Sequence, residues 1–292
     1  MGTEIQKLDL EANKYPDNMD GFNDGLTISA PRIIEEIHRS YLRAGADCIE
    51  TNTFGSNRLK LEEYGYSDRV VEVNELAASI AVSVTREFSD KQRFVIGSMG
   101  PSGYLPSSND PDLGRIELGK IVQAFSLQAE GLILGEVDAL LIETSQDILE
   151  VKLAIEGCFQ AILKTGKSIP IISNVTLDKY GKMLLGTNVQ AAYTTVCDMG
   201  ILAFGLNCST GPQEMDPSIR WLDEQDELPV LVMPNAGIPE NEGGKAVYKM
   251  SPSSMASTLK DFLHKYKNIR MIGGCCGTTP EHILEFSKMI RQ

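Results

Sequence analysis

Three of the six cysteines stand in segments that could bring their sulfurs to one point. Cys275 and Cys276 are adjacent within Gly-Gly-Cys-Cys-Gly, and Cys208 follows Asn207 at the end of an apolar run. Successive residues of a regular strand point to opposite faces, so the adjacent pair needs a sharp turn, which the flanking glycines allow. If the run before Cys208 ends at the same edge of a sheet, three thiolates surround one point.

Three thiolates are a ligand set for zinc, and they leave the fourth tetrahedral position open, as in catalytic rather than structural sites. A substrate thiol could fill that position and lose its proton there, which would make its sulfur a nucleophile at neutral pH. The alternative is a buried vicinal pair with Cys208 unrelated to it. Spacing alone leaves both interpretations open, because three separated cysteines are less specific than paired Cys-x-x-Cys motifs.

The remaining thiols and imidazoles have simpler interpretations. The other cysteines stand singly in apolar or helical stretches, which predicts buried packing residues: Cys48, Cys158 and Cys197. The histidines all fall in predicted helices away from the glycine-rich loops, which predicts no role in metal binding: His38, His264 and His282.

The elements that must position the thiols alternate along the whole chain. Short apolar runs predict buried strands at residues 47–51, 94–98, 139–143, 169–175, 203–207, 230–234 and 271–274. Helical periodicity occupies residues 31–44, 69–88, 118–134, 148–164, 189–199, 254–266 and 280–290. This alternation predicts one α/β domain over residues 1–292 with a parallel sheet, closed as a barrel or open. Polar, glycine-rich segments follow the strands, so we expect the active site at the carboxyl ends of the strands.

Composition excludes several classes of function. The net charge of −13 and the pI of about 4.8, without a basic stripe, argue against nucleic acid as a partner. The chain has no run of 18 apolar residues and begins with a polar segment, so we expect neither a membrane span nor a secretory signal. A cytoplasmic protein with reduced cysteines is the expectation.

Five sequence motifs carry a resemblance to a known family, and they lie at residues 44–57, 137–147, 205–212, 234–239 and 272–283. Through them the chain resembles the homocysteine S-methyltransferase family, and within it the homocysteine-binding domain of cobalamin-dependent methionine synthases. The resemblance extends over essentially the whole chain. It implies a (β/α)8 TIM-type barrel with zinc on the three cysteines singled out above.

The resemblance also implies a reaction and a substrate site. The reaction is transfer of a methyl group to the zinc-activated thiol of homocysteine, which gives methionine, with methylcobalamin as the donor. Glu143 is similar to the carboxylate that pairs with the homocysteine ammonium group. Three further residues resemble neighbours of the substrate, although each could instead fix loop backbone: Thr53, Asn207 and Asn235.

Two departures from the family pattern modify these expectations. Family members begin with a strand that ends in a motif like DGAMGTE, whereas this chain starts at Met1-Gly2-Thr3-Glu4. We therefore expect seven strands, with the first barrel strand missing because of a downstream start, trimming or gene degradation. The chain stops at Gln292, so we expect corrinoid-carrying and folate-binding domains on other domains or proteins. Betaine- or S-methylmethionine-dependent methyltransferases, and a non-catalytic remnant that binds zinc, are the alternatives.

Overall fold

The computed structural model describes residues 1–243 and 245–291. The chain divides into two compact units. The first comprises Met1–Ile142 and Leu149–Ile171, and the second comprises Glu143–Ile148 and Ile172–Gln292. Strands and helices alternate in both units, as the apolar runs and the helical periodicity predict.

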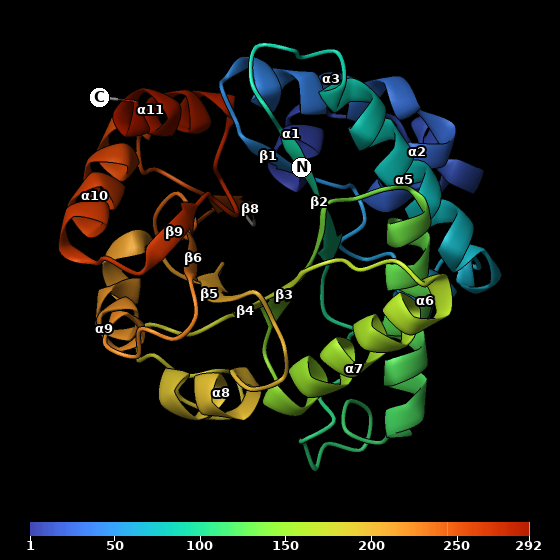
Figure 1. Cartoon of the computed structure of the whole chain (residues 1–292). Helices are drawn as coiled ribbons and strands as arrows, with labels where there is room; N and C mark the ends of the chain where they lie inside the picture. The colour runs from blue at the N-terminus through green and yellow to red at the C-terminus, as the bar shows by residue number, and fades with distance from the viewer. Residues whose placement is uncertain (244, 292) are drawn as a thin grey trace. The chain divides into compact units, whose positions relative to one another are not determined.

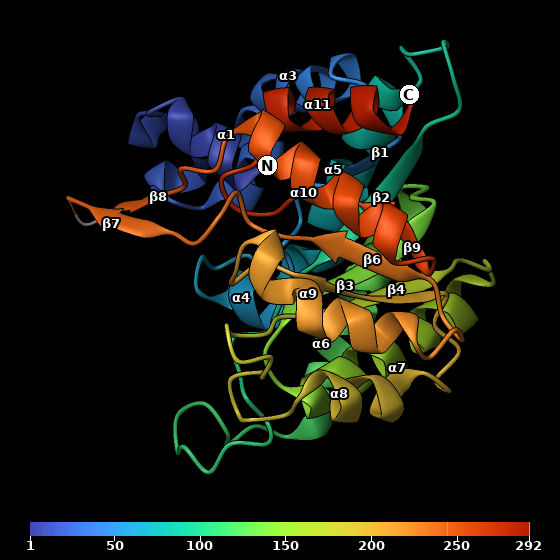
Figure 2. The ribbon, with the colours of Figure 1, turned by 90° about the vertical axis from the view of Figure 1, so that its left-hand side faces the viewer.

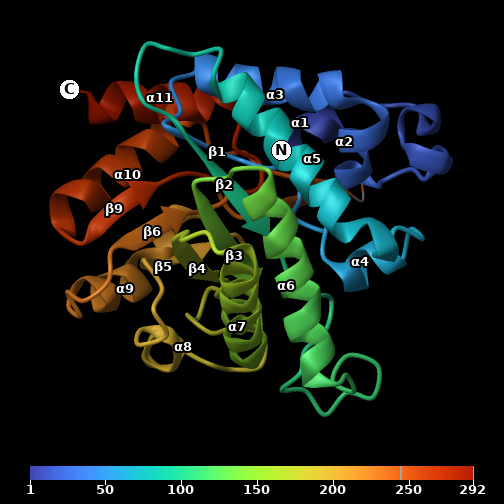
Figure 3. The ribbon, with the colours of Figure 1, turned by 45° about the vertical axis from the view of Figure 1, so that its right-hand side comes forward.

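The first unit contains a parallel arrangement of three strands, with β1 paired to β2 and β2 paired to β3. Its elements are α1 (Gly2–Lys7), α2 (Leu26–Ser29), α3 (Pro31–Arg43), β1 (Cys48–Glu50), α4 (Arg58–Glu62), α5 (Val70–Thr85), β2 (Phe94–Met99), α6 (Leu118–Leu134), β3 (Ala139–Ser145) and α7 (Ile148–Thr165). The last residues of β3 and the first residue of α7 belong to the second unit. The helices α3, α5 and α6 pack side by side (Figure 3).

The polar first segment of the chain folds onto the first unit through a few apolar side chains. Ile5 of α1 is buried together with Phe22 and Leu26, and the ring of Phe22 stacks on Tyr64 with centroids 4.2 Å apart. Short 3-10 turns connect α1 to α2. Within the described ranges no strand precedes β1, in agreement with the absence of an apolar run there.

The second unit carries the cysteine-containing loops. Its elements are β4 (Ile171–Val175), α8 (Val189–Val196), β5 (Ala203–Asn207), α9 (Pro212–Asp223), β6 (Val230–Met233), β7 (Glu240–Glu242), β8 (Lys245–Val247), α10 (Pro252–Lys265), β9 (Ile269–Ile272) and α11 (Pro280–Ile290). The first residue of β4 belongs to the first unit. Parallel pairing joins β4 to β5, β5 to β6 and β6 to β9. The helices α8, α9 and α10 lie outside these strands (Figure 1).

An antiparallel hairpin interrupts the alternation of the second unit. Strands β7 and β8 pair between β6 and α10, and the hairpin extends away from β6 and β9 (Figure 2). The sequence analysis did not predict this hairpin. It also did not predict α9, because Pro217 inside the helix and the polar residues around it break the helical signal.

The predicted α/β class and the seven parallel strands are confirmed, each strand within two residues of its expected start. An eight-stranded closed barrel is not among the described residues, which contain seven parallel strands and the hairpin. A single domain over residues 1–292 stays a prediction. No helix in the part of the chain that the structure describes is both long enough and apolar enough to span a membrane.

Candidate metal centre

The order β5, β6, β9 explains why the cysteines meet. The backbone N–H of Cys208, just after β5, donates to the Met233 carbonyl oxygen at 3.1 Å. On the other side of the same segment, the N–H of Cys275 donates to the Pro234 carbonyl oxygen at 2.8 Å. The segment that continues β6 is therefore held between the two cysteine-bearing loops, and it sets the distance between them.

The three sequence-predicted sulfurs come together in this unit. Those of Cys208, Cys275 and Cys276 all lie within 4.8 Å of one another, and the residues are half-buried. The Sγ atoms of Cys208 and Cys276 are 3.8 Å apart. Cys208 is thus a neighbour of the vicinal pair and not an unrelated cysteine.

The spacing and the chemistry of this donor set fit zinc. Zinc–sulfur bonds of about 2.3 Å in a tetrahedral site place two sulfurs about 3.8 Å apart, which is the distance between Cys208 and Cys276. Sulfur ligands favour soft or borderline ions such as zinc over calcium or magnesium. Residues Cys208, Cys275 and Cys276 could therefore hold one zinc ion.

The three cysteine thiols differ in the direction of their pKa shifts. Hydrogen bonds from Cys208 and Cys275 lower the pKa of Cys276 to about 3. Hydrogen bonds to Cys208 and Cys276 raise the pKa of Cys275 well above its usual value. The hydrogen bonds among the three sulfurs therefore favour the thiolate form at Cys276 over the other two cysteines.

The backbone at the end of β5 adopts an unusual conformation. Cys208 and Ser209 both have φ of 63°, in the left-handed region that residues other than glycine rarely occupy. The N–H of Thr210 donates to the Cys208 carbonyl oxygen at 2.8 Å and closes this turn. Such strain persists where the surrounding structure determines it, and it is concentrated at functional sites.

Asn207 connects the cysteines to the predicted substrate carboxylate. Its Nδ2 donates to Glu143 Oε2 at 3.1 Å and to Thr144 Oγ1 at 2.8 Å, and it lies 3.9 Å from Cys275 Sγ. Its Oδ1 accepts from the N–H of Thr144 at 2.8 Å. Thr144 has φ of 59°, which is a strained value for a β-branched residue. Asn207 therefore holds both the Glu143 carboxylate and the distorted backbone beside it.

The other predicted substrate neighbours have structural partners. The Oδ1 of Asn235 accepts from the N–H of Cys276 at 3.0 Å, so this side chain fixes the loop that carries the adjacent cysteines. Thr53 belongs to the first unit, where its hydroxyl donates to the Ser98 carbonyl oxygen at 2.7 Å. A substrate contact for these two residues stays a prediction.

Two expectations about the other cysteines and the histidines were wrong. Cys48 is exposed at the start of β1, whereas Cys158 is buried and Cys197 half-buried. His282 is not away from the loops. It lies in the first turn of α11, shortly after the cysteine loop. Its Nδ1 accepts from the N–H of Thr279 at 3.2 Å, and its Nε2 contacts the Met250 carbonyl oxygen at 3.1 Å. The turn that starts this helix places it there.

The sequence analysis also missed Tyr248, which follows β8. Its side chain packs on Gly277 of the cysteine loop, where a Cβ atom would lie 2.3 Å from Tyr248 Cβ. Burial and the charge of Cys276 raise the pKa of the Tyr248 hydroxyl, so it stays protonated. The only local signal is the glycine at 277, which makes room for the tyrosine. That relation is not visible without the fold.

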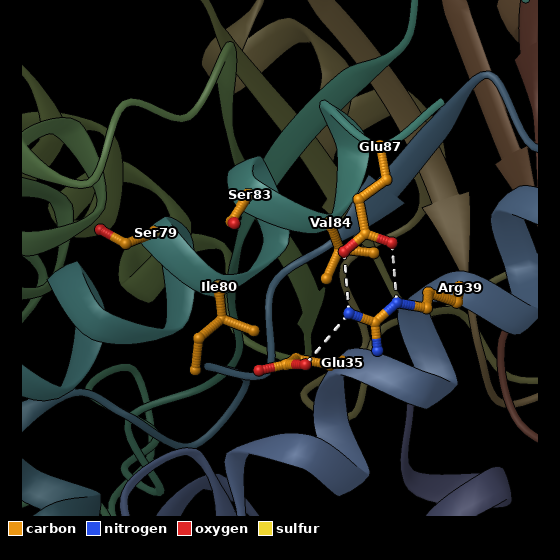
Figure 4. A pocket seen from close by; sticks show the side chains of 7 residues that line it. All are labelled: Glu35, Arg39, Ser79, Ile80, Ser83, Val84 and Glu87. Carbon is orange, nitrogen blue, oxygen red and sulfur yellow. Dashed lines mark hydrogen bonds and ion pairs between the residues drawn. The ribbon is translucent and has the colours of Figure 1, made fainter. Parts of the chain in front are cut away.

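A separate cavity of about 240 Å³ lies in the first unit between α3 and α5 (Figure 4). The Arg39 guanidinium lines this cavity and is paired with Glu87 at 2.8 Å and with Glu35 at 3.1 Å. The other lining residues are Ser79, Ile80, Ser83 and Val84. None of the predicted site residues lines this cavity, and its one arginine is paired with its two glutamates.

Comparison with known proteins identifies the family. The model of the homocysteine S-methyltransferase family matches residues 1–290. The chain is 40% identical over 292 residues to the methionine synthase of Mycobacterium tuberculosis and 38% identical to that of Mycobacterium leprae. It spans only 24% of the length of each of these proteins. Its fold is similar to that of the metallated homocysteine methyltransferase MmuM from Escherichia coli, with a TM-score of 0.76 at 20% identity over 99% of this chain and 93% of that one. The chain belongs to the homocysteine S-methyltransferase family.

Proposed function

We propose that the chain binds zinc through Cys208, Cys275 and Cys276 and methylates the thiol of homocysteine, which forms methionine. The observation that carries the proposal is the convergence of three sulfurs at a spacing that suits tetrahedral zinc. When bound, zinc supplies the Lewis acidity that keeps a substrate thiol deprotonated at neutral pH. Family membership supports homocysteine as the substrate.

The amino end of homocysteine is assigned to Glu143. The substrate sulfur and amino nitrogen are separated by three carbon atoms. Glu143 Oε2 and Cys275 Sγ both lie within 3.9 Å of the Asn207 amide nitrogen, so a carboxylate and the sulfur cluster are close together. Glu143 is 4% exposed, and its carboxylate can accept charge-assisted hydrogen bonds from an ammonium group.

The reaction needs no general base in this arrangement, because the thiol proton leaves when the substrate binds. The substrate sulfur forms a bond to the methyl carbon, while the bond from that carbon to the donor breaks and its electron pair stays with the donor. The role of the protein is to orient the two reacting atoms and to keep the sulfur free of solvent hydrogen bonds.

Methylcobalamin, carried by another domain or protein, is the proposed donor. The similarity to methionine synthases supports it, and a corrinoid-carrying and a folate-binding partner would accompany it. Supplying zinc-loaded chain and homocysteine with methylcobalamin, betaine or S-methylmethionine separates the donors. Methionine formed only from a donor other than methylcobalamin would replace this assignment, and none from any donor would favour a zinc-binding remnant.

Metal content of six single variants tests the ligand set. Alanine at Cys208, Cys275 or Cys276 should remove most of the zinc, because two thiolates remain and no histidine is among the clustered ligands in the described ranges. The matched controls are alanine at the three remaining cysteines: Cys48, Cys158 and Cys197. Equal zinc retention in both groups would overturn the proposal.

A second test addresses the substrate site. Glu143→Gln should weaken homocysteine binding, measured by calorimetry, while zinc content stays at the wild-type level. The reason is that the amide keeps the shape of the carboxyl group but loses its charge. A parallel loss of zinc would show that Glu143 supports the metal site and not the substrate.

A further inference from the structure

The imidazole of His282 lies between two backbone groups whose hydrogen-bonding roles are fixed. Its Nδ1 is 3.2 Å from the backbone nitrogen of Thr279, which can only donate, and its Nε2 is 3.1 Å from the carbonyl oxygen of Met250, which can only accept. The ring therefore accepts at Nδ1 and donates at Nε2, so its proton is on Nε2. Both ring nitrogens are used in these bonds, which leaves neither of them for a metal ion.

The first of these bonds is an ordinary helix cap, whereas the second is not. Thr279 and His282 form a capping box at the start of α11, in which the later side chain accepts from the N–H of Thr279. The residue at the position of His282 in such a box is commonly Glu or Gln. A glutamate could accept this bond, but it has no proton at neutral pH to donate to the Met250 carbonyl oxygen. Histidine thus does more here than a cap requires.

The Met250 peptide leads from His282 to one of the proposed metal ligands. Its N–H donates to the Ala236 carbonyl oxygen at 3.1 Å, and the N–H of Ala236 donates to the Cys276 carbonyl oxygen at 2.9 Å. The N–H of Cys276 in turn donates to Asn235 Oδ1 at 3.0 Å. Both polar groups of the Cys276 backbone are therefore bonded to residues 235–236, and His282 holds the segment that binds Ala236.

Packing shows how closely the segment of residues 248–250 contacts both loops. A Cβ atom at Gly237 would lie 3.2 Å from Met250 Cβ, and one at Gly277 would lie 2.3 Å from Tyr248 Cβ. Ala236 and His282 are buried, so water competes little with the hydrogen bonds between them. The segment 248–250 is therefore held between the loop after β6, the cysteine loop and the start of α11.

We propose that His282 is a positioning residue of the metal centre. By donating to the Met250 carbonyl oxygen it fixes the segment 248–250 against the loop after β6, and so it holds the backbone of Cys276 where its sulfur meets the other two sulfurs. This inference rests on the proposed function, because it assumes that the three cysteines bind zinc. His282 acts through Met250 and Ala236 and is not itself a ligand.

The rate at which the full chain releases zinc to a chromophoric chelator tests this role. His282→Glu keeps an acceptor for the Thr279 N–H but has no donor for Met250, so release should be about three- to tenfold faster, the factor that one hydrogen bond of ordinary net strength is worth. His282→Gln supplies both an acceptor and a donor, so it should restore most of the wild-type rate. The matched control is His264→Glu, which makes the same substitution in the exposed last turn of α10 and should leave the rate unchanged.

An uncharged second variant keeps the test valid if the buried glutamate prevents folding. In His282→Asn the side-chain oxygen replaces Nδ1 as the acceptor, but the amide is too short to reach Met250. This variant should therefore release zinc as fast as His282→Glu. Equally fast release from His282→Gln would contradict a role for the donated hydrogen bond.

Hydrogen exchange of backbone amides, measured by NMR, separates a local role from a general loss of stability. The amides of Ala236 and Met250 should exchange about three- to tenfold faster in His282→Asn than in the wild type, because the segment that they tie down has lost one bond. The reference is the amide of Ala192, which donates to the Asn188 carbonyl oxygen in α8 and should not change. Equal acceleration of all three amides would overturn the local role.

Nitrogen-15 spectra of the imidazole test whether His282 is a ligand. They should show the proton on Nε2 both with and without zinc, and direct coordination of a ring nitrogen would overturn the proposal. Wild-type zinc release and amide exchange in His282→Asn would overturn the role of His282 alone. A wild-type chain that binds no zinc would overturn the proposed function and this role with it.

Discussion

Replacing Asn207 by aspartate tests whether its amide holds Glu143 beside the cysteines. The substitution keeps the size and shape of the side chain, but it replaces Nδ2, which donates to Glu143 Oε2 at 3.1 Å, by a carboxylate oxygen. Asn207 is fully buried, so the new carboxylate cannot turn to solvent. The variant therefore places two like charges at hydrogen-bond distance.

The pair of carboxylates can either stay fully charged or bind one proton, and the less costly of these two states sets the loss of unfolding free energy. Two unit charges 3.1 Å apart repel by about 5 kcal/mol at an effective dielectric constant of about 20. Binding one proton avoids the repulsion, and at pH 7 this costs about 4 kcal/mol for a carboxyl group with a reference pKa of about 4. At pH 5 the same step costs about 1 kcal/mol. The pair should therefore hold a proton, and the variant should lose about 4 kcal/mol of unfolding free energy at pH 7.

The sign of the pH dependence follows from the raised pKa of the new pair. The folded variant keeps the proton well above pH 4, whereas the unfolded chain releases it near pH 4. The stability lost by Asn207→Asp should thus increase as the pH rises from 5 to 7, by about 3 kcal/mol relative to the wild type.

Urea unfolding at pH 5 and pH 7 measures this difference. Trp221 is the single tryptophan of the chain and lies on α9 in the second unit, so its fluorescence reports on the unit that carries the site. The control is Asn188→Asp, because Asn188 caps α8 through Oδ1 and aspartate is an equally good cap. It should change stability by no more than about 0.5 kcal/mol at either pH. Wild-type stability of Asn207→Asp at pH 7, or a loss that does not depend on pH, would refute the reasoning.

Three further predictions concern single positions. Gly277→Ala should lower both the stability of the fold and the zinc content, because the new Cβ would lie 2.3 Å from Tyr248. The control is Gly186→Ala, which has φ of 93° and open space around it, so it should cost only the ~1 kcal/mol of a left-handed alanine and leave the zinc content unchanged. Similar metal content in both variants would contradict this prediction. Burial raises the pKa of Asp24 to about 6 despite hydrogen bonds from Ser56 and Gly55, so unfolding free energy should fall as the pH rises from about 4 to 6, by about 3 kcal/mol. Asp24→Asn should remove that part of the slope in denaturant titrations, and an unchanged slope would count against the assignment. Burial lowers the pKa of His38 to about 3, so the unfolding free energy of the wild type should fall by about 2 kcal/mol between pH 7 and pH 5, as the unfolded chain becomes protonated. Calorimetric melting of His38→Leu should lack this loss. Equal acid sensitivity of both proteins would exclude His38 as its source.

The sequence predicted the elements whose signals are local. The apolar run at residues 203–207 has the bounds of β5, and the helical period over residues 118–134 has the bounds of α6. The side chains that these elements bury are those that their own apolar pattern marks, so the pattern and the structure agree. The helix α9 escaped prediction because Pro217 lies inside it, although Met215, Ile219 and Leu222 recur at helical spacing and are buried.

The errors and omissions at the site have a common origin. The exposure of Cys48, the contact of His282 with Met250 and the packing of Tyr248 on Gly277 each depend on a neighbour distant in the sequence. Residue type alone predicts that a cysteine is buried or that a helical histidine is remote. These expectations reflect the average behaviour of each residue type. They fail where a helix or strand begins or ends, since the local packing differs there.

By itself, the sequence predicted the family through its five motifs, and it predicted that three cysteines in glycine-rich loops would meet. Only the tertiary structure decided how those residues act together. Cys208 and Cys276 are 68 positions apart, and their sulfurs come within 3.8 Å because β5 and β9 pair on opposite sides of β6. The fold also brings Asn207 to Glu143, 64 positions away, and Tyr248 onto Gly277. Distances between residues far apart in the chain are set by strand order and register, which no local pattern of side chains encodes.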